Sequence, residues 1–72
     1  MDAIETSKVI ELAGGDLEFA RLLGLDQIPG FPQRVNNWKR RGMPSAVILD
    51  HYEVIRALRQ RAASEREQGQ AA

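Results

Sequence analysis

The 72-residue sequence has no cysteine, a single histidine and no long hydrophobic run. The lack of cysteine excludes a disulfide framework and a thiolate metal site, and one histidine is too few for a histidine-rich zinc site. No apolar run approaches the roughly 20 residues that span a bilayer, and Met1-Asp2 does not open a secretory signal. We therefore expect a soluble, cytosolic protein without a bound metal.

Motifs of catalytic sites are also missing. The sequence has no glycine-rich phosphate loop, no nucleophile elbow and no metal-ligand spacing. His51 stands within an apolar stripe without a second His or Cys nearby, which favours a partly buried side chain over a catalytic one. Asp50 and Glu53 fall on the polar side of the same stripe and are interpreted as solubilising charges. These absences predict a protein that is not an enzyme and binds no cofactor.

The sequence contains enough hydrophobic residues to form the core of one small domain. Its hydrophobic fraction is 43%, and a chain of this length buries about 60% of its unfolded surface. Alternating β-branched runs are missing, whereas apolar residues recur at helical spacing, so the predicted fold class is all-α. Four helices are expected over residues 2–13, 16–23, 32–41 and from 44 or 45 to 63. The domain is predicted to span residues 1–63, followed by a frayed or disordered tail over 64–72.

The predicted boundaries follow residues that cap or stop helices. Asp2, with Glu5 three positions later, fits a capping box, and Asp16 is expected to cap the second helix. Pro32 suits the first turn of the third helix because its missing N–H is not needed there. Helix stops are expected at Gly14, Gly24 and Gly42.

The third predicted helix has one apolar side and one polar, cationic side. Val35 and Trp38 point to the apolar side, and no acidic residue lies between Phe31 and Met43. Asn and Gln pair with adenine in the major groove and Arg with guanine, while Lys and Arg neutralise phosphates. The simpler alternative is an ordinary solvated helix face. The candidate DNA base contacts are Gln33, Asn36, Asn37 and Arg40, and the candidate phosphate contacts are Arg34, Lys39 and Arg41.

Charge is segregated along the chain although the formal net charge is zero. The acidic residues concentrate in residues 1–30, and the basic residues concentrate in residues 31–72. A neutral protein with a basic half can present a positive face to a polyanion. The neutral total therefore does not argue against nucleic acid as a partner.

Residues on both sides of the predicted turn resemble the helix-turn-helix of Cro- and cI-type phage repressors and their bacterial relatives. The matching positions are a small residue, a turn glycine with an apolar residue after it, and a buried Val followed three residues later by Trp. In this sequence they are Ala20, Gly24, Leu25, Val35 and Trp38. The resemblance covers roughly residues 3–55. It implies that Phe19 and Leu23 also hold the two helices together.

The turn departs from the family pattern. Val35 lies eleven residues after Gly24, about five more than in the family, so an enlarged turn spans residues 26–31. A surface turn tolerates such an insertion because loop-closure entropy grows slowly with length. The preferred interpretation is a spacer in which Ile28 and Phe31 tuck onto the core. The alternative is that the turn touches the phosphate backbone or a partner.

The resemblance implies a sequence-specific, DNA-binding transcriptional regulator, a repressor of phage or prophage type with helix 32–41 in the major groove. It also implies a homodimer on double-stranded DNA, which is in line with surplus apolar residues at Leu49 and at Leu58 and Ala62. The alternative is a protein-interaction module that docks on RNA polymerase, another regulator or a toxin. Ile28, Phe31 and the long last helix support that alternative.

Overall fold

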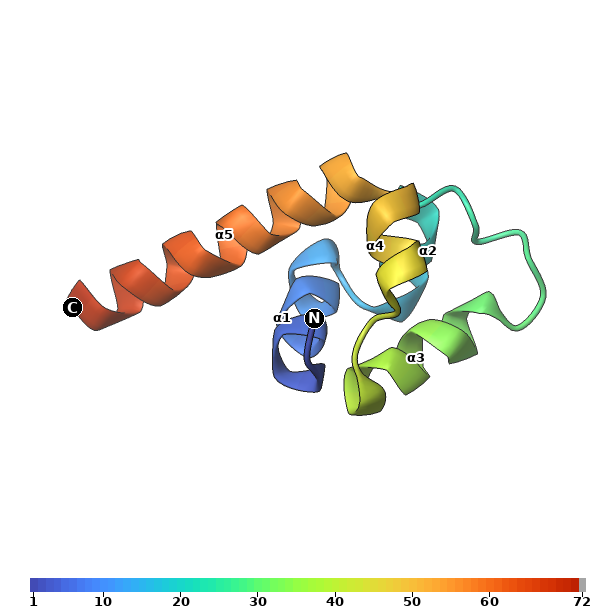
Figure 1. The fold of residues 1–72 in the computed structure, drawn as a ribbon, viewed down its shortest axis with the longest axis horizontal. Coiled ribbons are helices and arrows are strands. Elements are labelled where there is room, and N and C mark those ends of the chain that lie inside the picture. Colours follow the sequence, from blue (N-terminus) through green and yellow to red (C-terminus); the bar gives the residue numbers. More distant parts are fainter. Residues whose placement is uncertain (72) are drawn as a thin grey trace.

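Five helices account for most of the described chain. The computed structural model describes the backbone of residues 1–71 and the side chains of residues 1–65, and it contains no strand within that backbone. The predicted all-α class is therefore confirmed. In Figure 1, α5 runs past α1 and its far end projects from the other helices. The helices are α1 (Ala3–Ala13), α2 (Asp16–Leu22), α3 (Phe31–Arg41), α4 (Ser45–Asp50) and α5 (Tyr52–Ala71).

The start of α1 contains half of the expected capping box. Asp2 Oδ1 accepts a hydrogen bond of 2.7 Å from the backbone N–H of Glu5. The Glu5 carboxylate does not complete the box, since it forms an ion pair of 2.9 Å with Arg59 Nε on α5. The prediction that Asp16 caps α2 is wrong: Gly15 is the N-cap, and Asp16 is the first helical residue. Its carboxylate has a partner on α3 instead.

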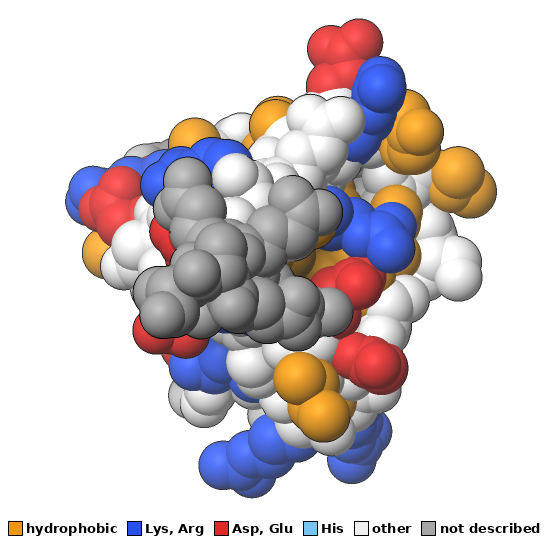
Figure 2. Space-filling model, turned by 90° about the vertical axis from the view of Figure 1, so that its left-hand side faces the viewer, with side chains coloured by type: hydrophobic (Ala, Val, Ile, Leu, Met, Phe, Trp, Pro, Cys, Tyr) orange, Lys and Arg blue, Asp and Glu red, His pale blue; other side chains and the backbone are white. Residues whose placement is uncertain are grey.

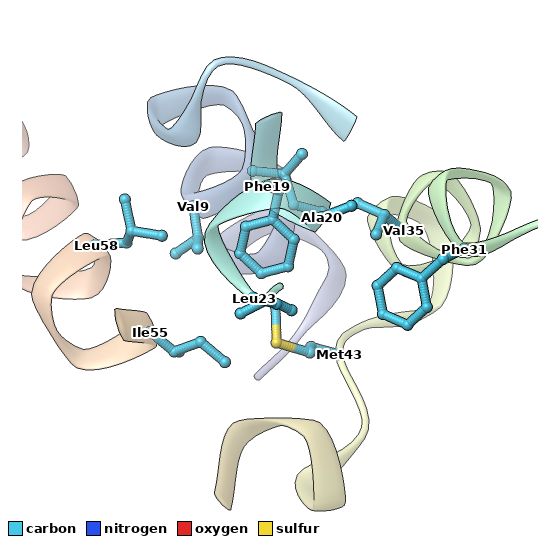
Figure 3. Packing of buried hydrophobic residues seen from close by; sticks show 10 residues of the cluster. Val9, Phe19, Ala20, Leu23, Phe31, Val35, Met43, Ile55 and Leu58 are labelled. Carbon is cyan, nitrogen blue, oxygen red and sulfur yellow. The ribbon is translucent and has the colours of Figure 1, made fainter. Parts of the chain in front are cut away.

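The hydrophobic core surrounds α2, and each of the other four helices contributes apolar side chains to it. Phe19 and Ala20 are fully buried, and Figure 3 shows Val35 of α3 pointing toward Ala20. Ala20 has only a methyl side chain, so it occupies little space between α2 and Val35 of α3. Of the residues expected to hold the two helices together, Phe19, Ala20, Leu23 and Val35 are buried, and Leu25 and Trp38 are partly buried against them. That part of the prediction is confirmed.

The predicted fourth helix is broken into two helices at His51. This residue has non-helical dihedrals (φ −127°, ψ 39°), so α4 ends at Asp50 and α5 begins at Tyr52. The break lets two apolar stretches meet the core from different directions, with Val47 and Ile48 on α4 and Ile55 and Leu58 on α5. In one continuous helix over residues 44–63, helical spacing would place Tyr52 on the apolar side with Ile48 and Ile55, but Tyr52 is 54% exposed. His51 itself is partly buried, as predicted.

The last helix is longer than predicted. It continues to Ala71, whereas the sequence predicted an end at residue 63 and a frayed or disordered tail over 64–72. The tail is rich in Glu, Arg, Gln and Ala, which have high intrinsic helix propensity even without an apolar stripe. A Lys8–Glu65 ion pair of 3.4 Å joins this helix to α1. Ala72 lies outside the described residues.

Candidate nucleic-acid interface

One side of α3 is fixed to the core and the other faces solvent. Phe31 and Val35 are buried, and the Phe31 ring meets the partly buried Trp38 ring edge to face at 5.6 Å. A T-shaped aromatic pair stabilises this side beyond its buried area alone. The opposite side carries the predicted contact residues Gln33, Arg34, Asn36, Asn37, Arg40 and Arg41, all of them exposed.

The enlarged turn leads into α3 through a series of tight turns. Ile28 N–H donates to the Leu25 carbonyl at 3.1 Å, and Phe31 N–H donates to the Ile28 carbonyl at 3.1 Å. Helix α3 begins at Phe31, one residue before the predicted start, with Pro32 in its first turn. Phe31 tucks onto the core as expected, but Ile28 remains 47% exposed. The expectation that both side chains are buried is therefore right for Phe31 and wrong for Ile28.

The carboxyl end of α3 is attached to α1. Thr6 is fully buried, and its Oγ1 accepts a hydrogen bond of 3.0 Å from the backbone N–H of Met43. The neighbouring Ser7 Oγ donates to the Lys39 carbonyl at 3.1 Å, which satisfies one of the free carbonyls of a helix end. Gly42 lies against the start of the chain, where a Cβ atom would come within 2.6 Å of the Met1 carbonyl oxygen. These contacts fix the position of the last turn of α3.

A charged contact attaches α3 to α2. Lys39 Nζ lies 3.0 Å from Asp16 Oδ1, and that carboxylate oxygen is buried. The Lys39 side chain is partly buried and directed toward α2, whereas the other predicted phosphate contacts are exposed. A buried carboxylate oxygen without a compensating charge would be unfavourable, so Lys39 has a structural partner within the protein. The structure therefore does not bring Lys39 together with Arg34 and Arg41.

Thr6 and Ser7 are the residues that the sequence interpretation missed, and for Asp16 it missed the ion pair with Lys39. Thr6 lies three and four positions before Val9 and Ile10, and this spacing marks it as a member of the buried face of α1. A polar residue on a buried face needs a hydrogen-bond partner. The helical spacing therefore predicts that Thr6 is buried and hydrogen-bonded. It does not identify the hydrogen-bond partner, because Met43 lies 37 residues further along the chain.

The exposed side of α3 is cationic and free of acid. Arg34, Arg40 and Arg41 have no carboxylate within 4.0 Å among the side chains of residues 1–65, and no residue of α3 is acidic. Two of these arginines lie in the last turn, where the helix dipole favours positive charge. Figure 2 shows basic side chains projecting from the lower edge of the molecule, the edge along which α3 ends in Figure 1.

Comparison of this chain with protein-family models, curated proteins and solved structures found no match. The structure establishes an all-α fold with a cationic helix face. None of the helices described is long and apolar enough to cross a membrane. The function assigned to the helix face is therefore argued from its residues.

Proposed function

We propose that the chain is a sequence-specific DNA-binding transcriptional regulator in which α2 and α3 form a helix-turn-helix and α3 enters the major groove. The observation that carries this proposal is the exposed, acid-free side of α3, with amide and guanidinium groups together on one surface. A repressor of the Cro-like phage or prophage type is the form that the sequence resemblance favours. Such a protein acts in the bacterial cytosol or on the nucleoid.

The residues of α3 divide into two chemical roles. Gln33, Asn37 and Arg40 recur at helical spacing and form one exposed strip of α3, with Asn36 beside it. These four residues are proposed to contact base edges, since amides pair with adenine and guanidinium groups with guanine. Arg34 and Arg41 flank that strip and are proposed to contact phosphates. We assign Lys39 a positioning role in place of the predicted phosphate contact, because its ammonium group already pairs with Asp16.

The dimensions of α3 suit this role. An α-helix has a diameter of about 10–12 Å including side chains, and the major groove of B-DNA is about 12 Å wide. The 11 residues of α3 are enough to place several side chains along base edges. Because both ends of α3 are held, by Phe31 at the start and by Thr6 and Ser7 at the end, little backbone ordering is required on binding.

The test is a fluorescence-anisotropy titration of random-sequence duplex from about 50 to 200 mM salt, followed by selection of the bound sequences. Contacts with several phosphates release counterions, so we expect affinity to fall steeply with salt and one sequence to be enriched. Absent binding or salt-insensitive binding would contradict the proposal. That result would favour the protein-interaction module, for which the half-exposed Ile28 in the enlarged turn is the supporting observation.

A further inference from the structure

A groove of about 330 Å³ lies where α5 passes α1 (Figure 1). Its apolar floor is formed by Ile48 of α4 together with Ile55 and Ala62 of α5. Along α5 the lining residues run from Tyr52 to Ala63, which is about 16 Å of helix at a rise of 1.5 Å per residue. Small-molecule sites in proteins have volumes of about 300–1,000 Å³. The groove is therefore an elongated apolar site of a size that takes one small ligand.

The rim of the groove carries more positive than negative charge. Lys8 of α1 and Arg56 and Arg59 of α5 line it. Arg59 Nε lies 2.9 Å from Oε1 of Glu5, a carboxylate that also lines the groove. Lys8 Nζ lies 3.4 Å from Glu65 Oε2. Arg56 is exposed and has no carboxylate within 4.0 Å among the side chains that the structure describes, so one positive charge is left over beside the apolar floor.

The acidic neighbour of Arg56 on α5 does not neutralise it. Glu53 lies three positions earlier, but it forms no ion pair with Arg56 among the described side chains and lines a separate hollow together with Leu49. Tyr52 lies four positions before Arg56 and lines the groove, so a ring and a guanidinium group are neighbours on the same side of α5. The unpaired cation therefore stands next to apolar surface.

The groove lies on the side of α1 that faces away from α3. Thr6 and Ser7 form hydrogen bonds with the segment at the end of α3. Glu5 and Lys8 form ion pairs with α5. At about 100° per residue, these two pairs of positions fall on opposite sides of an α-helix. A ligand in the groove would thus leave the exposed side of α3 free.

We propose that the groove binds a small, unbranched apolar monocarboxylate of the medium-chain fatty acid type, with the carboxylate on Arg56 and the chain along the apolar floor. One carboxylate matches the one cation left over, whereas a phosphate group would bring nearly two negative charges close to Glu5. The guanidinium fork also matches a carboxylate in geometry, since it donates two parallel hydrogen bonds. The elongated floor favours an extended chain over a compact ring system.

The experiment is a ¹H–¹⁵N NMR titration of the full chain with sodium octanoate in the absence of DNA. Saturable amide shifts are expected along the groove, at residues such as Lys8, Arg56 and Gln60. Acetate lacks the chain and 1-octanol lacks the charge, so each is expected to bind about tenfold more weakly than octanoate, or weaker still. Intermolecular NOEs from the octanoate chain to the methyl groups of Ile48 and Ala63 are expected to place the chain on the floor.

A matched pair of variants tests the position of the carboxylate. Arg56→Gln is expected to raise the dissociation constant of octanoate about tenfold and to leave that of 1-octanol unchanged, because only the contact with the charge is lost. Arg61→Gln removes the same charge from an exposed position of α5 outside the groove and is expected to change neither constant. Circular dichroism checks that both variants keep their helix content.

Three results would overturn the proposal. They are the absence of saturable shifts with octanoate, equal binding of octanoate and 1-octanol, and wild-type octanoate binding by Arg56→Gln. The first of them would favour an acidic, apolar segment of a partner protein as the occupant of the groove. Because the titrations contain no DNA, these outcomes are independent of whether α3 binds DNA.

Discussion

The hydroxyl oxygen of Thr6 accepts a hydrogen bond of 3.0 Å from the backbone N–H of Met43, a residue 37 positions further along the chain. Thr6 lies in α1, and Met43 is the second residue after α3. The contact is buried, so water does not substitute for it. The end of the proposed recognition helix is therefore positioned by α1 as well as by its neighbour α2.

Replacement of Thr6 by Val is expected to lower the free energy of unfolding by about 1–3 kcal/mol, because the Met43 N–H would stay buried without an acceptor. Val has nearly the same shape as Thr, so packing changes little. Urea denaturation measures the loss. Thr6→Ser keeps the acceptor and serves as the control, and an equal loss in both variants would show that packing, not the hydrogen bond, sets the effect.

Replacement of Gly42 by Ala is expected to destabilise the fold more than replacement of Gly24 by Ala. Both glycines have positive φ angles, 98° and 73°, which L-residues adopt at a cost of about 1–2 kcal/mol. At Gly42 the added Cβ would also lie 2.6 Å from the Met1 carbonyl oxygen, whereas at Gly24 it would meet no atom within 4 Å. Thermal unfolding of the two variants compares them directly. Equal melting temperatures would mean that the start of the chain moves aside freely.

The Lys39–Asp16 ion pair is expected to contribute up to about 1 kcal/mol, because both side chains are partly exposed and solvent screens their attraction. A double-mutant cycle with Asp16→Asn and Lys39→Met measures this coupling by urea denaturation. The single Lys39→Met variant is expected to lose more stability than Asp16→Asn, since it leaves the buried Asp16 oxygen without its counter-charge. No coupling in the cycle would mean that the two groups do not interact in solution.

Replacement of Asn37 or Arg40 by Ala is expected to weaken binding to a selected DNA sequence by about 1–3 kcal/mol without changing the melting temperature. Both side chains are exposed on α3 and make no hydrogen bond or ion pair among the contacts described. Arg61→Ala on α5 removes the same charge from a different exposed surface and is the matched control. Unchanged affinity in both α3 variants would show that α3 does not read the bases.

Replacement of Arg34 by Ala is expected to reduce the slope of log affinity against log salt by about one, because one phosphate contact is lost. The loss should be similar for selected and random duplexes, since phosphates carry no sequence information. Anisotropy titrations at several salt concentrations provide both slopes. A slope equal to that of the wild type would exclude Arg34 as a phosphate contact.

The segment over α3 was well predicted because its pattern is strong. Pro and Gly delimit it, and the buried positions Val35 and Trp38 recur at helical spacing, so the start was wrong by only one residue. The exposed residues of α3 could be predicted from the buried ones, because a surface helix that buries one side presents the opposite side to solvent. The break at His51 was not predicted, since the apolar residues before and after it continue one helical period.

The sequence by itself determined the all-α class, the residues of the α2–α3 core and the composition of the outer side of α3, since each depends on periodicity and on turn residues close in the chain. The tertiary structure decided which polar groups meet across long separations: Thr6 with Met43, Ser7 with the Lys39 carbonyl, and Lys39 with Asp16. It also decided that Tyr52 faces solvent. A local pattern shows which side of a helix is buried, but only the packing of helices against one another fixes which atoms come within hydrogen-bonding distance.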